Sequence, residues 1–275
     1  MSKDHEPRID LGIVGGMGPL ASAEFVRTVY EYGLGEREQL SPTVLLYSDP
    51  TFPDRTDAFM SGNDGPVLEK LIDVITRLDR LGAEKIIICC MTIHYLVPRL
   101  PEALRSKIVS PLDVIFESVE QSLKESLLIC STGSRKVGLF ESHPKWAKLG
   151  QKILLPSETD QELIHRNLIY PMKLNPELSD SFPVFDSVLK KYKVDSFIAG
   201  CSEIHMLAKS FLASKEYGSF YSCLDPFTTI ARRISEELAQ KVLNPAHGSG
   251  WIVQVRTIHT VYQLPDSTFA GFGDK

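Results

Sequence analysis

The chain has 275 residues, 43% of them hydrophobic, and its 30 Lys and Arg against 35 Asp and Glu give a net charge of −5. This balance is typical of a folded globular protein and excludes the collagen-like, low-complexity and disordered classes. Basic residues run no further than pairs such as Lys190-Lys191, so the sequence carries no electrostatic footprint for nucleic acid or an anionic membrane surface. We therefore expect a small-molecule partner, with no nucleic acid and no membrane.

The amino terminus and the apolar runs bear on where the protein works. Residues 1–7 are charged and polar, with no apolar run leading to a small-residue cleavage site, so they do not resemble a signal peptide. Apolar runs such as 86–90 and 126–130 have the length of a strand and are too short to span a bilayer. The expectation is a cytoplasmic protein.

The cysteines form an odd set without a CxxC pair. They are Cys89, Cys90, Cys130, Cys201 and Cys223. In a chain this long, their spacing disfavours both a disulfide framework and a zinc site. We expect free thiols and no metal.

Short β-branched runs alternate with longer amphipathic stretches along the chain. The predicted strands are 9–14, 43–47, 85–89, 107–109, 126–130, 152–155, 196–199 and 220–223. The predicted helices are 19–32, 66–81, 92–104, 112–123, 136–149, 160–169, 181–192, 202–214 and 226–243. This alternation predicts an α/β protein, because helical crossovers between strands produce parallel sheets covered by helices.

An internal repeat is the most informative feature of the sequence. Between residues 88–96 and 199–207, Cys, Ile, His and Leu recur at equal spacing, so that Cys90 corresponds to Cys201. The repeat predicts two pseudo-symmetric parallel-sheet α/β domains. Because such sheets bind ligands beyond the carboxyl ends of their strands, we expect the active site in the cleft between the domains.

The predicted domain boundaries follow the repeat. The first domain covers residues 1–113, contains Cys90, and is joined by the helix at 225–243. The second domain covers residues 114–224 and contains Cys201. Residues 246–275 depart from the alternation and are predicted to be a C-terminal extension.

Each repeated cysteine follows a buried-strand pattern and begins a helix. At a helix N-terminus, the free N–H groups and the helix dipole favour a thiolate and can also hold a substrate carboxylate. Glu203 lies close to Cys201 and opposes the ionisation of that thiol, and the sequence leaves open which effect is stronger. Cys89 has the opposite side-chain direction along its strand and is expected to pack in the core, as are Cys130 and Cys223.

Two thiols that face each other across a substrate carbon suit stereochemical inversion. One removes a proton from one face while the other donates a proton to the opposite face. A cysteine hydrolase needs a single cysteine with an oriented histidine, and a redox pair is usually a local CxxC, so both fit the repeat less well. His94 and His205, one helical turn beyond the repeated cysteines, are expected in the interior or at the floor of the site.

Four stretches of the chain resemble the motifs of the aspartate/glutamate racemase family in order and spacing. They are LGIVGGMGP at 11–19, SDPTFPDRT at 48–56, CMTIHY at 90–95 and GCSEI at 200–204. The resemblance covers roughly residues 9–243. It implies an enzyme that uses neither PLP nor a metal and is usually a homodimer. It also implies two pseudo-symmetric α/β domains that each contribute one cysteine to the cleft.

The resemblance also assigns roles to individual residues. It implies that Cys90 and Cys201 are the catalytic acid/base pair, with Cys201 taking the proton from the L-enantiomer and Cys90 from the D-enantiomer. Arg55 matches the arginine that holds the distal carboxylate, a role that its planar fork suits, and Lys173 matches a substrate-contacting lysine. The other implied substrate-binding residues are Met17, Gly18, Met91, Thr92, Thr132, Gly133, Ser134, Ser202 and Glu203.

One departure from the family pattern bears on the substrate. Met91 stands where the family usually has Asn, which removes a side-chain amide expected near the substrate carboxylate. We expect a pocket that is more apolar on that side.

The sequence thus predicts a PLP-independent amino-acid racemase of amino-acid metabolism. L-aspartate to D-aspartate is the preferred reaction, with glutamate second. One alternative is a family relative acting on another carboxylate, such as an epimerase, decarboxylase or isomerase of a specialised pathway. The other is a catalytically silent member that binds an amino acid.

Overall fold

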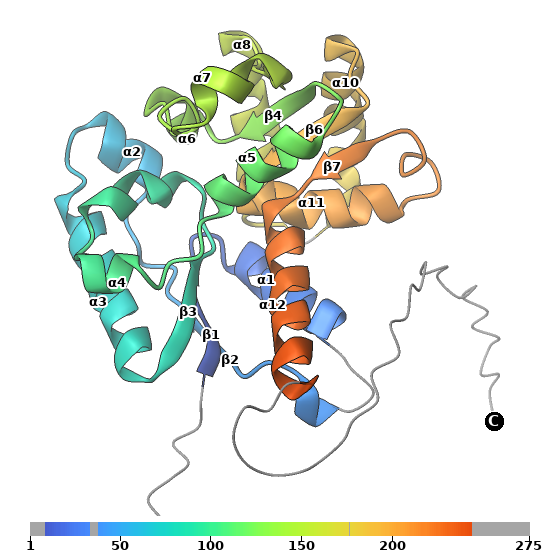
Figure 1. The fold of residues 1–275 in the computed structure, drawn as a ribbon. Coiled ribbons are helices and arrows are strands. Elements are labelled where there is room, and N and C mark those ends of the chain that lie inside the picture. Colours follow the sequence, from blue (N-terminus) through green and yellow to red (C-terminus); the bar gives the residue numbers. More distant parts are fainter. Residues whose placement is uncertain (1–8, 34–37, 176, 244–275) are drawn as a thin grey trace, which may run out of the picture. The chain divides into compact units, whose positions relative to one another are not determined.

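Among the described residues, 9–33, 38–175 and 177–243, the computed structural model contains two parallel sheets (Figure 1). The first has the order β2-β1-β3 and consists of β1 (Ile9–Gly15), β2 (Val44–Ser48) and β3 (Ala83–Ile88). The second has the order β5-β4-β6-β7 and consists of β4 (Ser126–Cys130), β5 (Ile153–Leu154), β6 (Ser196–Gly200) and β7 (Ser222–Leu224). The predicted α/β class with parallel sheets is confirmed.

Helices connect the strands throughout. Those up to β4 are α1 (Pro19–Gly33), η1 (Glu38–Leu40), α2 (Arg55–Met60), α3 (Gly65–Arg80), η2 (Thr92–Arg99), α4 (Glu102–Arg105) and α5 (Pro111–Gln121). Those after β4 are α6 (Thr132–Lys136), α7 (Trp146–Leu149), η3 (Gly150–Lys152), α8 (Glu158–Leu163), η4 (Ile164–Ile169), α9 (Tyr170–Met172), η5 (Ser179–Ser181), α10 (Phe182–Tyr192), α11 (Ser202–Ala213) and α12 (Pro226–Leu243).

Serine side chains fix where several of these helices begin. Ser110, Ser131 and Ser157 each accept a hydrogen bond from a backbone N–H in the first turn of α5, α6 and α8. These bonds satisfy donors that have no partner within the helix. Pro111 supports the start of α5, because its fixed φ suits the first turn.

The structure differs from the predicted elements in three places. The helix expected at 92–104 is divided into the 3₁₀ helix η2 and the short α4, because Leu100, the residue before Pro101, has an extended backbone. The helix expected at 136–149 is likewise divided, with Gly138 at a φ of 62° after α6. The strand expected at 107–109 makes only an isolated bridge between Ile86 and Ile108.

One apolar cluster contains residues of both sheets. It includes Ile13 of β1 and Leu128 of β4, together with Phe25 of α1, Phe116 of α5 and Phe227 of α12. The cysteines Cys89 and Cys130 are also buried in this cluster. Both sheets and their covering helices lie in the compact unit Met1–Leu238, whereas the predicted extension 246–275 lies outside the described residues.

A buried polar node lies beside this cluster. His205 of α11 is 0% exposed, and its Nδ1 lies 2.6 Å from Oδ2 of Asp225, which caps α12. Its Nε2 lies 3.1 Å from the Thr28 hydroxyl of α1. The node therefore joins α1, α11 and α12 directly behind the strand end that carries Cys201.

Replacing His205 with Ala tests how much this buried polar node contributes to the stability of the fold. We expect the free energy of unfolding to fall by about 3–5 kcal/mol, because the variant removes a fully buried ring together with its hydrogen bonds to Asp225 and Thr28. Urea denaturation measures the change. The control, Arg77→Ala, removes an exposed ion pair with Asp73 and should leave the free energy of unfolding nearly unchanged. Equal losses in the two variants would contradict this account.

Candidate active site

The carboxyl ends of four strands meet at one small cavity. Met17 follows β1, Cys90 follows β3, Ser131 follows β4 and Cys201 follows β6, and all four line the cavity. Its volume is about 20 Å³, which is room for a single water molecule. Parallel strands of an α/β sheet bind ligands at this edge, so the topology itself brings the two repeated cysteines to one site.

The structure brings together seven of the residues expected from the sequence. Those that line the cavity are Met17, Arg55, Cys90, Thr92, Lys173, Cys201 and Glu203. The expected residues outside its lining, as far as the structure describes the chain, are Gly18, Met91, Thr132, Gly133, Ser134 and Ser202. Sequence reasoning did not single out Asp54, Thr56, Ser131, His165, Ile169 and Tyr170, which also line it.

Two glycines outside the lining leave room for side chains that form the cavity wall. A Cβ at Gly18 would lie 2.7 Å from Oε1 of Glu203. A Cβ at Gly133 would lie 2.5 Å from the Thr56 hydroxyl, where α2 and α6 pack against each other. A side chain at either position would therefore displace a residue of the cavity wall.

A buried cation lies beside Cys90. Arg55 is 8% exposed, and its Nη1 and Nη2 donate to the carbonyl oxygens of Pro53 at 3.0 Å and Met17 at 3.1 Å. Its Nε has no partner among the described residues. Burial opposes the charge of Arg55, yet the pKa of this guanidinium lies above its ordinary value because Cys90 and Asp54 lie beside it.

A buried anion lies beside Cys201. The Cys201 thiol donates to Oε2 of Glu203 at 2.7 Å, and the Ser202 hydroxyl donates to the same oxygen at 3.2 Å. Nζ of Lys173 lies 3.7 Å from the other oxygen, Oε1. Burial, followed by the Glu203 charge, raises the pKa of the Cys201 thiol well above its ordinary value. Cys201 is therefore protonated at neutral pH, which answers the question that the sequence left open.

Three hydroxyls form a triangle at the edge of the cavity. Thr92 Oγ1 lies 2.9 Å from Oγ of Ser131 and 2.9 Å from Oγ of Ser134, and these two are 3.0 Å apart. Thr92 follows a strand of the first sheet, whereas Ser131 follows a strand of the second. Hydroxyls can donate or accept, so the triangle can turn donors toward a carboxylate.

Met91 packs in the core. Its side chain is 1% exposed and belongs to the cluster that contains Phe116 and Cys89. The apolar pocket wall expected from the change of Asn to Met is therefore absent from the described lining of the cavity.

The cavity residues that sequence reasoning missed fall into two groups. Asp54 and Thr56 flank Arg55, and Ser131 precedes Thr132, so proximity to a motif was the available signal. His165 and Tyr170 lie in and directly after the π-helix η4. π-helical turns are frequent at functional sites, but the sequence of this segment gives no sign of the altered hydrogen-bond pattern.

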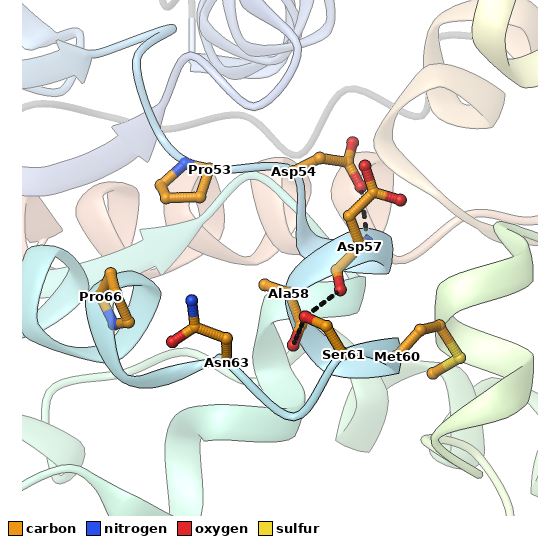
Figure 2. A pocket seen from close by; sticks show the side chains of 8 residues that line it. All are labelled: Pro53, Asp54, Asp57, Ala58, Met60, Ser61, Asn63 and Pro66. Carbon is orange, nitrogen blue, oxygen red and sulfur yellow. Dashed lines mark hydrogen bonds between the residues drawn. The ribbon is translucent and has the colours of Figure 1, made fainter.

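A larger hollow lies between α2 and the start of α3. Its volume is about 600 Å³, and Figure 2 shows Pro53, Ala58, Asn63 and Pro66 around it, with Asp57 at one side. The described lining contains no cysteine and no cation. We therefore assign the candidate site to the smaller cavity, where the reactive groups lie.

The described part of the chain lacks two features that would suggest other functions. No group of three or more His, Cys, Asp or Glu side chains there could hold a metal ion. Among the same residues, no helix has both the length and the apolar character needed to cross a membrane.

Comparison with known proteins identifies the family. The chain matches the family model of Asp/Glu/Hydantoin racemases over residues 14–215 and belongs to that family. The resemblance seen in the sequence is thereby confirmed, and the protein is a member of a racemase family.

Solved structures of racemases have a similar fold. Picrophilus torridus aspartate racemase superposes with a TM-score of 0.71 at 20% identity, covering 84% of this chain and 94% of that one. A putative Asp/Glu racemase from Yersinia pestis gives a TM-score of 0.61 at 21% identity, covering 84% and 99%. Glutamate racemase from Campylobacter jejuni gives 0.53 at 18% identity, covering 83% and 85%. At these identities, the likeness shows the two-domain α/β fold and leaves the substrate to be proposed.

Replacing Met91 with Asn tests the placement of this side chain. We expect the free energy of unfolding to fall by about 2–4 kcal/mol, because the variant loses apolar contacts and buries an amide without partners. Urea denaturation measures the loss, and Met60→Asn, at a position 44% exposed, is the control, with an expected change within about 0.5 kcal/mol. A stable Met91→Asn protein with altered amino-acid binding would place Met91 on the cavity.

Proposed function

We propose that the protein racemises an acidic α-amino acid, aspartate in preference to glutamate, by a two-base reaction of Cys90 and Cys201 that needs neither PLP nor a metal. The observation that carries this proposal is the presence of both thiols on one cavity, with a guanidinium beside one and a carboxylate beside the other. Family membership supports the reaction class.

The unequal surroundings of the thiols suggest how the reaction starts. Cys201 carries its proton in the free protein and is ready to act as the acid. Cys90 then acts as the base and removes the α-proton from the opposite face of the substrate carbon. By the family assignment this pattern fits the D-enantiomer, and the reverse direction requires the opposite protonation of the coupled pair.

The cations of the cavity suit the charges of an acidic amino acid. Arg55 retains its unpartnered Nε and further Nη protons for a carboxylate. Burial opposes the charge of Lys173, but Glu203 and Cys201 raise the pKa of this ammonium above its ordinary value, so it stays charged. Loss of the α-proton places negative charge on the substrate carboxylate, which these cations and the Thr92 hydroxyl stabilise.

The cavity is too small for a substrate, so the protein must open during each catalytic cycle. A volume of about 20 Å³ does not admit an amino acid, so the walls must part for entry. Thr56 packs against Gly133 at one place where they would separate. Closure over the substrate excludes water and strengthens the electrostatic interactions inside.

The alternative of a relative with a different carboxylate substrate rested on Met91. Because that side chain packs in the core, this reason no longer favours the alternative. The domain boundaries at 1–113 and 114–224, the homodimer and the cytoplasmic location stay predictions.

Serine variants of the two cysteines test the mechanism. In deuterated buffer, we expect Cys90→Ser to exchange the α-proton of L-aspartate alone and Cys201→Ser that of D-aspartate alone, because a serine hydroxyl is a far weaker acid than a thiol and does not ionise to form the base at neutral pH. NMR measures the exchange, and net racemisation should vanish in both variants. Cys223→Ser, whose sulfur is outside the described cavity lining, is the matched control and should racemise normally. Full racemisation in either cavity variant would exclude the two-thiol mechanism.

Replacing Arg55 with Lys tests the carboxylate contact. We expect aspartate binding to weaken by about 2–5 kcal/mol, because Lys cannot form the planar fork and loses the two fixed carbonyl contacts. The KM for aspartate, followed by circular dichroism, reports the change. Arg166→Lys, at an exposed side chain paired with Glu162, should leave it unaltered. Normal aspartate kinetics in Arg55→Lys would refute the assignment.

A further inference from the structure

Glu203 is a buried carboxylate with one oxygen unused. The residue is 1% exposed, and Oε2 already accepts from the Cys201 thiol and the Ser202 hydroxyl. Oε1 has no hydrogen-bond partner among the described residues, and Nζ of Lys173 lies 3.7 Å from it, beyond hydrogen-bond distance. This ion pair with Lys173 leaves Oε1 without a hydrogen bond in the described part of the chain. A buried carboxylate oxygen that accepts no hydrogen bond is costly, so its retention at a ligand cavity points to a donor that arrives with the ligand.

Two buried groups of the cavity lack hydrogen-bond partners in the described part of the chain, and one is a donor whereas the other is an acceptor. Nε of Arg55 is a cationic donor without a partner, and Oε1 of Glu203 is an anionic acceptor without one, among the residues that the structure describes. Asp54, the other carboxylate of the lining, already accepts from a backbone N–H of α2. A ligand that satisfies both groups therefore carries a carboxylate and a separate hydrogen-bond donor with positive charge.

The charged side chains of the cavity further restrict which class of ligand it can bind. The cavity lining contains two cations, Arg55 and Lys173, and its buried carboxylate is Glu203, whereas the carboxylate of Asp54 is exposed. An acidic amino acid with a free amine has two carboxylates and one ammonium, which is the complementary set. The same acid with its nitrogen acylated, or closed into a hydantoin ring, lacks the positive charge and would leave Oε1 unpaired.

We propose that Oε1 of Glu203 binds the α-ammonium of the substrate, which makes Glu203 the residue that selects free amino acids over their N-acyl and hydantoin forms. This inference rests on the proposed function and specifies its substrate class. A site built around a buried hydrogen-bonding group discriminates strongly against ligands that lack the matching group. The ammonium also offsets the carboxylate charge beside Cys201, so that amine binding and the proton transfer of that thiol are linked.

Calorimetric binding of matched ligands to the whole protein tests this inference without requiring turnover. The probes are racemic aspartate, succinate, which is aspartate without its amine, N-acetylaspartate and hydantoin-5-acetate. We expect the wild-type protein to bind aspartate about 30-fold or more tightly than each of the other ligands. In Glu203→Gln, the ratio of aspartate to succinate affinity should fall at least about tenfold, because the neutral amide no longer attracts the ammonium.

Glu158→Gln is the matched control, because it replaces an exposed carboxylate of α8 and should leave the affinity ratio unchanged. The wild-type panel remains decisive if Glu203→Gln does not fold. Wild-type affinity for succinate or hydantoin-5-acetate equal to that for aspartate would overturn the inference. An affinity ratio unchanged in a folded Glu203→Gln protein would do the same.

The outcomes separate this inference from the proposed function. Exchange of the aspartate α-proton together with an unchanged affinity ratio in Glu203→Gln would refute the role of Glu203 and leave the racemase proposal standing. Selective, Glu203-dependent binding of aspartate without any exchange would support the role of Glu203 and refute the racemase proposal.

Discussion

The convergence of strand ends on one cavity is the constraint on which the rest of this structure depends. Parallel strands direct their carboxyl ends to one edge of a sheet, and here β1 and β3 of one sheet meet β4 and β6 of the other. Each sheet then delivers a cysteine from its own strand end. The apolar cluster that contains both Ile13 and Leu128 packs the two sheets together, so the relative position of the thiols depends on the packing of this core.

The two cysteines occupy equivalent positions in the repeat, but the charged side chains beside them differ. Arg55 lies beside Cys90, whereas Glu203 accepts a hydrogen bond from the Cys201 thiol. The two thiols therefore have different electrostatic surroundings, which suits the separate acid and base roles that we propose for them. The two oxygens of Glu203 have different environments: Oε2 accepts a hydrogen bond from the Cys201 thiol, and Oε1 accepts none among the described residues.

Sequence reasoning predicted the features that depend on chain order. The alternation of short and long segments is sufficient for the α/β fold, and the equal spacing within the repeat is sufficient to pair Cys90 with Cys201. The helix predicted at 92–104 is interrupted because Pro101 favours an extended backbone at Leu100, and this local preference outweighs the apolar pattern. The outcome at Met91 could not be predicted, because the sequence does not say whether a side chain at a strand end turns into the core or the cavity.

Electrostatic outcomes also needed the structure. Whether the helix start or Glu203 dominates at Cys201 depends on burial, which raises the pKa of the thiol before any charge acts on it. The π-helical turn that brings His165 to the cavity likewise depends on backbone hydrogen bonds that leave no pattern in the residues.

The stereochemical course in deuterated water tests the central claim, a two-thiol stereoinversion, most directly. With each aspartate enantiomer in turn, circular dichroism follows the reaction while NMR locates the deuterium. The account predicts that deuterium enters the product enantiomer first, because each face is served by its own thiol. It also predicts that the optical signal passes through zero before returning, because a C–D bond breaks more slowly than a C–H bond and the deuterated product therefore reverts more slowly than the starting enantiomer reacts. A signal that decays directly to zero, with deuterium entering the starting enantiomer as fast as the product, would contradict it.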